Sequence, residues 1–228
     1  MLKAVLFDCD GVIADTERIH FGLFRTILAE ELGLELDWAE YLDRYLAMDD
    51  RGCFAAVARA RGRALTENDL RRLIAKKTEL YKKEASRHLV ILPGVVEFVM
   101  AAAQKYPLAV ASGALRQEVL MVLDAAGIRP YFDGIVAAED VANGKPAPDA
   151  YLKAMAVLNA KFSGKGIRPE ECLVIEDSRH GVASARAAGM KCLALSTSYP
   201  AEALSAADKT VANLAAVRLS EVEALFAS

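Results

Sequence analysis

The chain has 228 residues, more than a usual single domain, which predicts one domain with a sizeable insertion or two lobes. Hydrophobic residues make up 54% and charged residues 26% of it, which supports a buried core and excludes disordered, collagen-like and low-complexity chains. The formal net charge of -3 provides no broad positive field, so we expect neither nucleic acid nor a membrane as a partner.

The chain shows no sign of a targeting or membrane segment. Its longest apolar stretch, residues 89–103, is interrupted by Pro93, Gly94 and Glu97, and nothing near Met1 resembles a signal peptide. We therefore expect a cytoplasmic protein. The cysteines lie far apart beside apolar residues and form no C-x-x-C pair, which predicts reduced, buried thiols. They are Cys9, Cys53, Cys172 and Cys192.

Short apolar runs alternate with helical patterns along most of the chain. This alternation predicts an α/β fold with a Rossmann-like parallel sheet that is covered by helices. Because the runs are almost entirely apolar, we expect strands buried on both faces. The expected strands are residues 3–7, 108–111, 134–138, 172–175 and 191–195. The expected helices are residues 95–105, 116–126, 149–159 and 180–188, the last with Gly189 as a left-handed C-cap.

The alternation stops between residues 16 and 88, where helical spacing dominates. We therefore expect an α/β core domain of residues 1–15 and 89–228 and an inserted helical domain of residues 16–88. Thr66 followed by Asp69 is typical of a capping box at the start of a long helix. The apolar stripe of that helix is Leu70, Leu73, Ile74 and Tyr81. The two junctions of the insertion are predicted hinges.

Paired acidic residues follow two of the expected strands. Asp8 and Asp10 come directly after the first strand, and Glu176 and Asp177 come directly after the strand at 172–175. The carboxyl ends of parallel strands meet at one edge of a sheet, where open α/β sheets bind ligands. Carboxylates this close repel each other unless a cation or a proton lies between them. An ordinary turn could explain the first pair, and an N-cap could explain the second. Because paired acids recur at two strand ends, we favour a Mg²⁺ site.

Two further strands end in residues suited to phosphate. Ser112 and Gly113 follow the strand at 108–111 and precede a helix, which places a hydroxyl and backbone amides at the same edge. Lys145, in a loop stiffened by two prolines, follows the next strand and offers a point charge. Each feature has an ordinary explanation by itself. Four at consecutive strand ends predict a site that handles phosphate and metal.

These motifs, in this order, resemble the four signature motifs of the haloacid dehalogenase superfamily. The resemblance covers nearly the whole chain. Residues 8–16, 144–149 and 176–181 are similar to the branch that contains phosphoglycolate phosphatase, small sugar-phosphate phosphatases and β-phosphoglucomutase. The cap domain of that branch is a helical bundle inserted after the first strand, as expected for residues 16–88.

The resemblance implies a phosphatase that forms an aspartyl-phosphate on Asp8, with Asp10 as general acid and base. It implies Mg²⁺ as cofactor, bound by Asp8, the backbone carbonyl of Asp10 and Asp177, with Glu176 as a ligand or an outer partner. Phosphate-binding residues are then Ser112, Gly113 and Lys145. We expect a small phosphorylated metabolite, a sugar phosphate or phosphoglycolate-like ester, as substrate and a monomer or weak homodimer.

The runner-up within the family is a phosphomutase of the β-phosphoglucomutase type. A mutase binds a bisphosphate through its cap, where the candidate substrate contacts are His20, Arg51 and Lys77. His20 has a packed side chain as its ordinary explanation, and Lys77, on the apolar stripe, either extends to solvent or meets an anionic substrate. The segment 111–116 lacks the polar residues that mutases place after the serine. This favours a phosphatase.

More distant alternatives are disfavoured. Asp10 disfavours a dehalogenase, which lacks an acid at that position. A cysteine phosphatase centred on Cys9 needs arginine six residues later, where Asp15 stands. Dinucleotide binding needs a glycine-rich turn after the first strand, which offers only Gly11. A non-enzymatic receiver-type domain carries its phosphorylated aspartate on a middle strand and gives the helical insertion no role.

Overall fold

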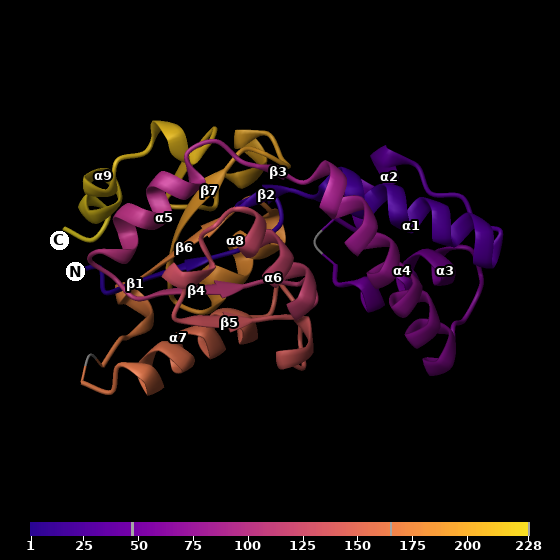
Figure 1. Ribbon diagram of the computed structural model, residues 1–228, viewed down its shortest axis with the longest axis horizontal. Helices are drawn as coiled ribbons and strands as arrows, with labels where there is room; N and C mark the ends of the chain where they lie inside the picture. Colours follow the sequence, from indigo (N-terminus) through magenta and orange to yellow (C-terminus); the bar gives the residue numbers. More distant parts are fainter. Residues whose placement is uncertain (47, 165, 228) are drawn as a thin grey trace. The chain divides into compact units, whose positions relative to one another are not determined.

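The structure, a computed structural model, describes residues 1–46, 48–164 and 166–227. The chain divides into two compact units, Met1–Asp15 with Val90–Ser228 and Thr16–Leu89, which we call the core unit and the helical unit (Figure 1). The second junction falls one residue later than the boundary expected from the sequence. Among the described residues, no helix has the length and apolar character needed to cross a membrane.

The core unit contains a parallel sheet whose order is β5-β4-β1-β6-β7-β8. Its strands are β1 Ala4–Phe7, β4 Leu108–Ala111, β5 Gly134–Val136, β6 Cys172–Glu176, β7 Lys191–Leu195 and β8 Lys209–Val211. The parallel α/β fold expected from the sequence is confirmed. The edge strand β8 was not predicted, because its residues are half-buried and form no apolar run.

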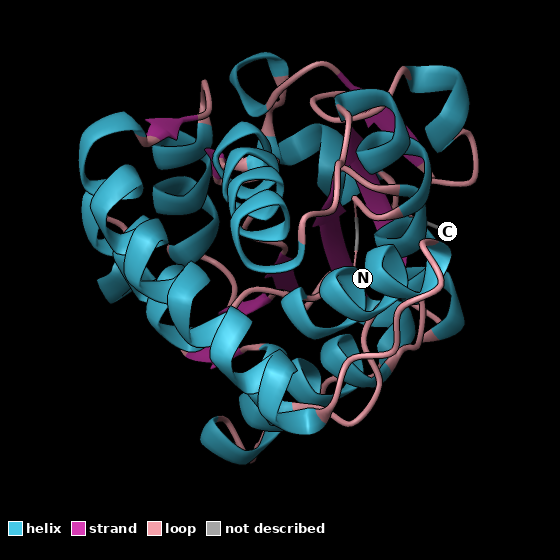
Figure 2. Cartoon of the chain, turned by 90° about the vertical axis from the view of Figure 1, so that its right-hand side faces the viewer, coloured by secondary structure: helices cyan, strands magenta, loops and turns pink. Residues whose placement is uncertain are grey.

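The helices of the core unit lie within two residues of the expected ranges. They are α5 Val95–Ala103, α6 Arg116–Ala125, α7 Asp149–Lys161 and α8 Arg179–Ala187, with the unpredicted α9 Leu219–Ala224 near the C-terminus. Gly189 follows α8 with φ 75°, the left-handed conformation that its position predicts. Figure 2 shows the strands with helices around them.

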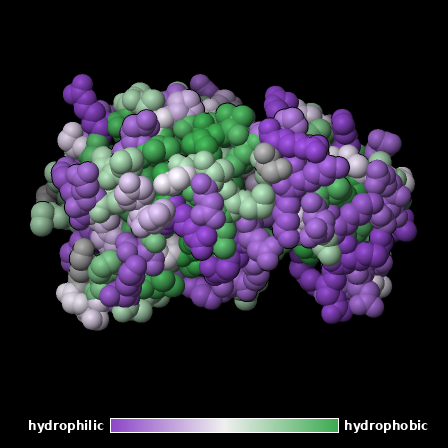
Figure 3. All heavy atoms as spheres, viewed as in Figure 1, coloured by the Kyte–Doolittle hydropathy of each residue, from purple (hydrophilic) through white to green (hydrophobic). Residues whose placement is uncertain are grey.

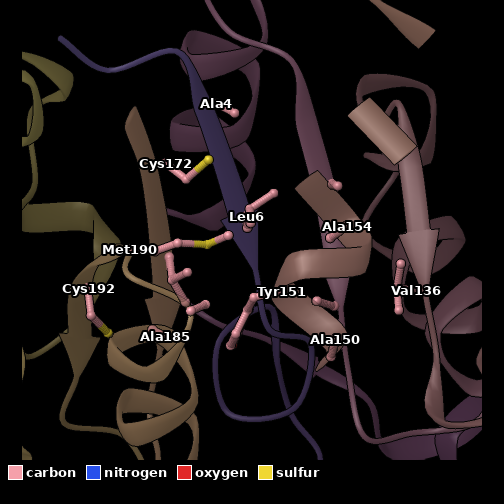
Figure 4. Close-up of a cluster of buried hydrophobic side chains, with 14 of the residues drawn as sticks. Ala4, Leu6, Val136, Ala150, Tyr151, Ala154, Cys172, Ala185, Met190 and Cys192 are labelled. Carbon is pink, nitrogen blue, oxygen red and sulfur yellow. The ribbon is translucent and has the colours of Figure 1, made fainter. Parts of the chain in front are cut away.

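The two faces of the sheet are buried by different helices. Helices α7 and α8 contact each other, and each packs against strands of the sheet. Figure 4 shows Tyr151 and Ala154 of α7 beside Leu6 of β1 in this apolar layer. On the other face, the ring of Phe7 meets Phe98 of α5 edge-to-face at 6.2 Å. Apolar side chains on both faces thus hold β1 in the middle of the sheet.

The chain leaves and re-enters the core unit through two short paired strands. Strand β2 (Ala14–Asp15) pairs with β3 (Val90–Ile91) in antiparallel fashion, and the amide of Leu92 donates to the carbonyl of Ile13 at 3.0 Å. The segments expected to be separate hinges are therefore hydrogen-bonded to each other beside the junctions.

The helical unit consists of helices connected by short loops. They are α1 Glu17–Leu32, α2 Trp38–Arg44, α3 Asp50–Ala60 and α4 Glu67–His88. The predicted capping box is present, since Asp69 donates its amide to the Thr66 side chain and accepts from the Thr66 amide. Leu70, Leu73 and Tyr81 are buried on the expected stripe of α4. The visible surface of this unit is mostly hydrophilic (Figure 3).

Candidate active site

Strand β1 delivers Asp8 to the carboxyl edge of the sheet. The amide of Asp8 donates to the carbonyl of Ile175 at 3.0 Å, which continues the pairing with β6. The chain then turns sharply at Gly11, whose φ of 71° disfavours any residue with a Cβ. Asp8 is therefore held at the end of a central strand, and only 8% of its surface is exposed.

Lys145 joins the ends of β1 and β6. Its Nζ lies 2.9 Å from Asp8 Oδ1 and 2.5 Å from Glu176 Oε1, and its side chain is only 6% exposed. Burial alone lowers the pKa of Lys145, but the two carboxylates outweigh this effect and raise the pKa above its ordinary value. Lys145 is thus a buried cation beside the carboxyl group of Asp8.

The carboxylate of Glu176 is enclosed by hydrogen-bond donors. Its Oε2 accepts from the amides of Asp177 and Ser178, at 2.9 and 3.0 Å, and from the Ser178 hydroxyl at 3.0 Å. Its Oε1 accepts from Lys145 and from the hydroxyl of Tyr151 at 2.8 Å. Although burial raises the pKa of Glu176, Lys145 and these donors outweigh it and lower the pKa. Glu176 therefore orients its neighbours.

Asp8, Glu176 and Asp177 each offer an oxygen, and these oxygens lie within 4.8 Å of one another. Asp8 and Glu176 contact the Lys145 ammonium, and together with Asp177 they give three buried acidic groups beside this one cation among the described residues, so the acidic groups are in excess. Burial is the main cause that raises the pKa of Asp8 to about 8. An all-oxygen donor set with excess negative charge fits a small hard divalent cation such as Mg²⁺. The carboxylate of Asp10 is not part of this cluster.

Strand β4 brings the predicted phosphate-binding residues to the same edge. Ser112 Oγ lies 3.5 Å from Asp10 Oδ2 and accepts the amide of Ala114 at 3.0 Å. Gly113 is exposed, and a Cβ added there would meet no atom within 4 Å. The structure thus places the sequence-predicted residues of the core unit around the ends of β1, β4 and β6.

The cysteine thiols are poorly suited to nucleophilic chemistry. All four cysteines are buried and form no disulfide, as their positions in the sequence predict. Burial, reinforced by Asp10 and Asp8, raises the pKa of Cys9 well above its ordinary value. A buried thiol with a raised pKa is a poor nucleophile, which disfavours Cys9 as the nucleophile of the site.

In the helical unit, two of the three candidate substrate contacts lie together. Lys77 is fully buried, and its Nζ lies 2.8 Å from His20 Nδ1 and 2.5 Å from Asp50 Oδ1. The alternative that Lys77 extends to solvent is therefore wrong, because an ion pair with Asp50 compensates its charge inside the unit. Arg51 lies elsewhere, with its exposed guanidinium paired to Glu67.

Several residues that contact these sites were not predicted from the sequence. Asp50 begins α3, and its Oδ2 is buried with no hydrogen-bond partner among the described residues. Tyr151 lies on α7 in the apolar stripe that predicts core packing, so nothing in the pattern distinguishes its hydroxyl. Thr197 and Ser198 follow β7, and Ser198 donates to Asp177 Oδ2. The strand-end argument used for four strands applies to β7 as well and would have found them.

A sequence profile of the haloacid dehalogenase-like hydrolases matches residues 2–189. The chain therefore belongs to this family of hydrolases, which confirms the family that its motifs resemble.

Two relatives match most of the chain. It is 34% identical to the protein CbbY of Rhodobacter capsulatus, over 98% of this chain and 99% of that protein. It is 31% identical to the fructose-1-phosphate phosphatase YqaB of Escherichia coli, over 82% of this chain and 92% of that protein. The crystal structure of CbbY from Rhodobacter sphaeroides in complex with phosphate is 27% identical, with a TM-score of 0.85 over 98% of this chain and all of that one.

A β-phosphoglucomutase from Clostridium difficile has a TM-score of 0.87 at 22% identity, over 99% of this chain and 97% of that one. At this identity the similarity concerns the fold, which phosphatases and mutases of the family share.

Proposed function

We propose that the protein is a Mg²⁺-dependent phosphatase that hydrolyses a small phosphate monoester of a carbohydrate through an aspartyl-phosphate. The observation that carries the proposal is the buried Asp8 carboxylate at the end of β1, paired with Lys145 beside Glu176 and Asp177. The relative in Escherichia coli, named as a fructose-1-phosphate phosphatase, supports the class of substrate. So does the Thermotoga maritima relative, named as a phosphorylated carbohydrates phosphatase, at 31% identity.

In this mechanism a carboxylate oxygen of Asp8 attacks phosphorus, and the bond from phosphorus to the ester oxygen breaks. Asp10 donates a proton to the leaving alcohol and then removes one from the water that hydrolyses the aspartyl-phosphate. The Lys145 ammonium, the Ser112 hydroxyl and the Gly113 amide hold the transferring phosphoryl group. Asp8, the backbone carbonyl of Asp10 and Asp177 would hold Mg²⁺, which would supply Lewis-acid stabilisation of the phosphoryl charge.

We further propose that the helical unit selects the substrate. His20, Lys77 and Asp50 form a buried polar cluster in that unit, and Asp50 Oδ2 has no partner among the described residues. A buried acceptor without a donor costs free energy, and a substrate hydroxyl would satisfy it. Arg51, the third candidate, offers a cation to an anionic substrate once it leaves Glu67. A polyhydroxylated phosphate ester has both kinds of group.

The test is phosphate release from a panel of sugar phosphates and phosphoglycolate in Mg²⁺. We expect Asp8→Asn to lower kcat/KM by at least about a thousandfold, because the amide is not a nucleophile. Asp124→Asn, on the exposed Asp124–Arg129 pair, is the matched control and should keep the parental rate. Parental activity in Asp8→Asn contradicts the mechanism. Conversion of β-glucose 1-phosphate to glucose 6-phosphate with a bisphosphate primer, without phosphate release, identifies a mutase instead.

A further inference from the structure

Two hydroxyl side chains that follow β7 contact the candidate metal site. Ser198 donates its hydroxyl to Asp177 Oδ2, and Thr197 donates its hydroxyl to the carbonyl oxygen of Gly11 at 2.5 Å. Asp177 follows β6, and Gly11 lies in the turn after Asp10. One short segment therefore binds both carboxylate-bearing loops of the cluster.

These three pieces of chain pack without free space. A Cβ added to Gly11 would lie 1.9 Å from Asp177 Oδ2 and 2.8 Å from Ser198 Oγ, far inside van der Waals contact. The glycine is thus required both by its backbone conformation and by the approach of the Asp177 carboxylate. Ser198 could not approach Asp177 in this way if the turn carried a side chain.

The segment is anchored independently of the site. Strand β7 pairs with β6 on one side and β8 on the other. The amide of Ser196 donates to the carbonyl of Val211 at 2.8 Å, and the Ser196 hydroxyl lies 3.4 Å from the same oxygen. Thr197 and Ser198 directly follow this hydrogen-bonded residue of the sheet, so their hydroxyls are well placed to position other groups.

We propose that Ser198 and Thr197 are positioning residues for the divalent cation of the proposed phosphatase, on whose magnesium site this inference rests. Ser198 fixes the rotation of the Asp177 carboxylate through one oxygen, so that the carboxylate is preorganised for a cation. Thr197 holds the turn after Asp10 against the same segment. Without these hydrogen bonds the ligand groups lose orientation before the cation binds, and the affinity for Mg²⁺ falls.

The experiment measures Mg²⁺ binding by isothermal titration calorimetry on the full chain without substrate. We expect Ser198→Ala to weaken Mg²⁺ binding by about 10- to 100-fold, the range for lost outer partners of metal ligands. Thr197→Val, which keeps the shape of the side chain, should weaken it to a smaller extent. The matched control is Ser196→Ala, which removes a hydroxyl from the same segment without touching the cluster and should bind within twofold of the parent.

Two further measurements distinguish positioning from a purely structural role. The unfolding midpoint of each variant in EDTA should stay near that of the parent, and kcat of Ser198→Ala at saturating Mg²⁺ should recover to within a few-fold. Equal Mg²⁺ affinity in the parent, Ser198→Ala and Thr197→Val overturns the positioning role. Equal weakening in Ser196→Ala also overturns it. A parent that binds no Mg²⁺ overturns the metal site, and with it the proposed function.

Discussion

The hydroxyl of Tyr151 offers a test of what burial adds to a hydrogen bond, because the chain contains a second bond of the same kind. Glu176 Oε1 accepts from Tyr151 at 2.8 Å and from Lys145 at 2.5 Å. Glu223 Oε1 accepts from Tyr106 at 2.8 Å and from Lys105 at 3.0 Å. Glu176 is fully buried, whereas the side chain of Glu223 is 31% exposed.

Tyr151→Phe keeps the ring and removes only the donor. A hydrogen bond to a charged group contributes about 1.5–3 kcal/mol, and water cannot replace the lost donor at Glu176. We therefore expect the free energy of unfolding to fall by about 2 kcal/mol, which lowers the melting temperature by about 4–8 °C in a chain of this size. Tyr106→Phe should cost about 0.5 kcal/mol or less, because solvent reaches Glu223 and screens the pair.

Urea unfolding, followed by circular dichroism at pH 7, measures both variants against the parent. The slope of the free energy against urea should not change, so that the shift in midpoint reports stability alone. Equal losses in Tyr151→Phe and Tyr106→Phe would refute the reasoning that burial sets the strength of this bond. A loss below about 0.5 kcal/mol in Tyr151→Phe would show that Lys145 and the other donors satisfy Glu176 without the tyrosine.

Two further predictions concern a close approach at Gly181 and the ionisation of Glu171. Gly181→Ala places a Cβ 1.8 Å from the Glu176 carboxylate and should lower both kcat and the free energy of unfolding, the latter by about 1–3 kcal/mol. A Cβ at Gly22 meets no atom within 4 Å, so the control Gly22→Ala should stabilise α1 by about 0.5–1 kcal/mol. Urea titrations that rank these variants alike contradict the packing argument. Hydrogen bonds from Arg168 and Lys3 lower the pKa of Glu171 to about 2. The stabilisation is present above the pKa of the unfolded carboxyl and lost toward pH 2, so the deficit of Glu171→Gln should shrink as pH falls from about 4.5 to 2. A deficit that stays constant with pH excludes this ionisation as its cause.

The sequence predicted the sheet and the edge where the site lies because these depend on patterns that each strand carries by itself. The run at 172–175 is apolar because β6 is buried on both faces, and the acids after it stand out for that reason. The half-exposed strand β8 carries no such pattern and was missed. A strand was thus predictable where its residues form an apolar run.

The hydrogen bonds to Glu176 were not predictable from the sequence, because they come partly from a residue whose position in the pattern predicts core packing. Tyr151 belongs to the apolar face of α7, and its hydroxyl reaches Glu176 only because α7 packs against the sheet. Lys77 falls on the apolar stripe of α4 in the same way. The pattern leaves open whether it extends to solvent, and only the positions of His20 and Asp50 show that its charge is compensated inside.

The order of the sheet explains why residues from distant parts of the chain share one site. Strands β4 and β5 lie on one side of β1, and strands β6, β7 and β8 lie on its other side. This order leaves β1 and β6 as neighbours, so Asp8 and Asp177 lie at adjacent strand ends although 168 residues separate them. Lys145 lies in the connection between β5 and β6, and its ammonium compensates one of the negative charges of the acidic cluster. The remaining negative charge is what a divalent cation would neutralise, and the segment after β7 lies on the β6 side, where it reaches Asp177.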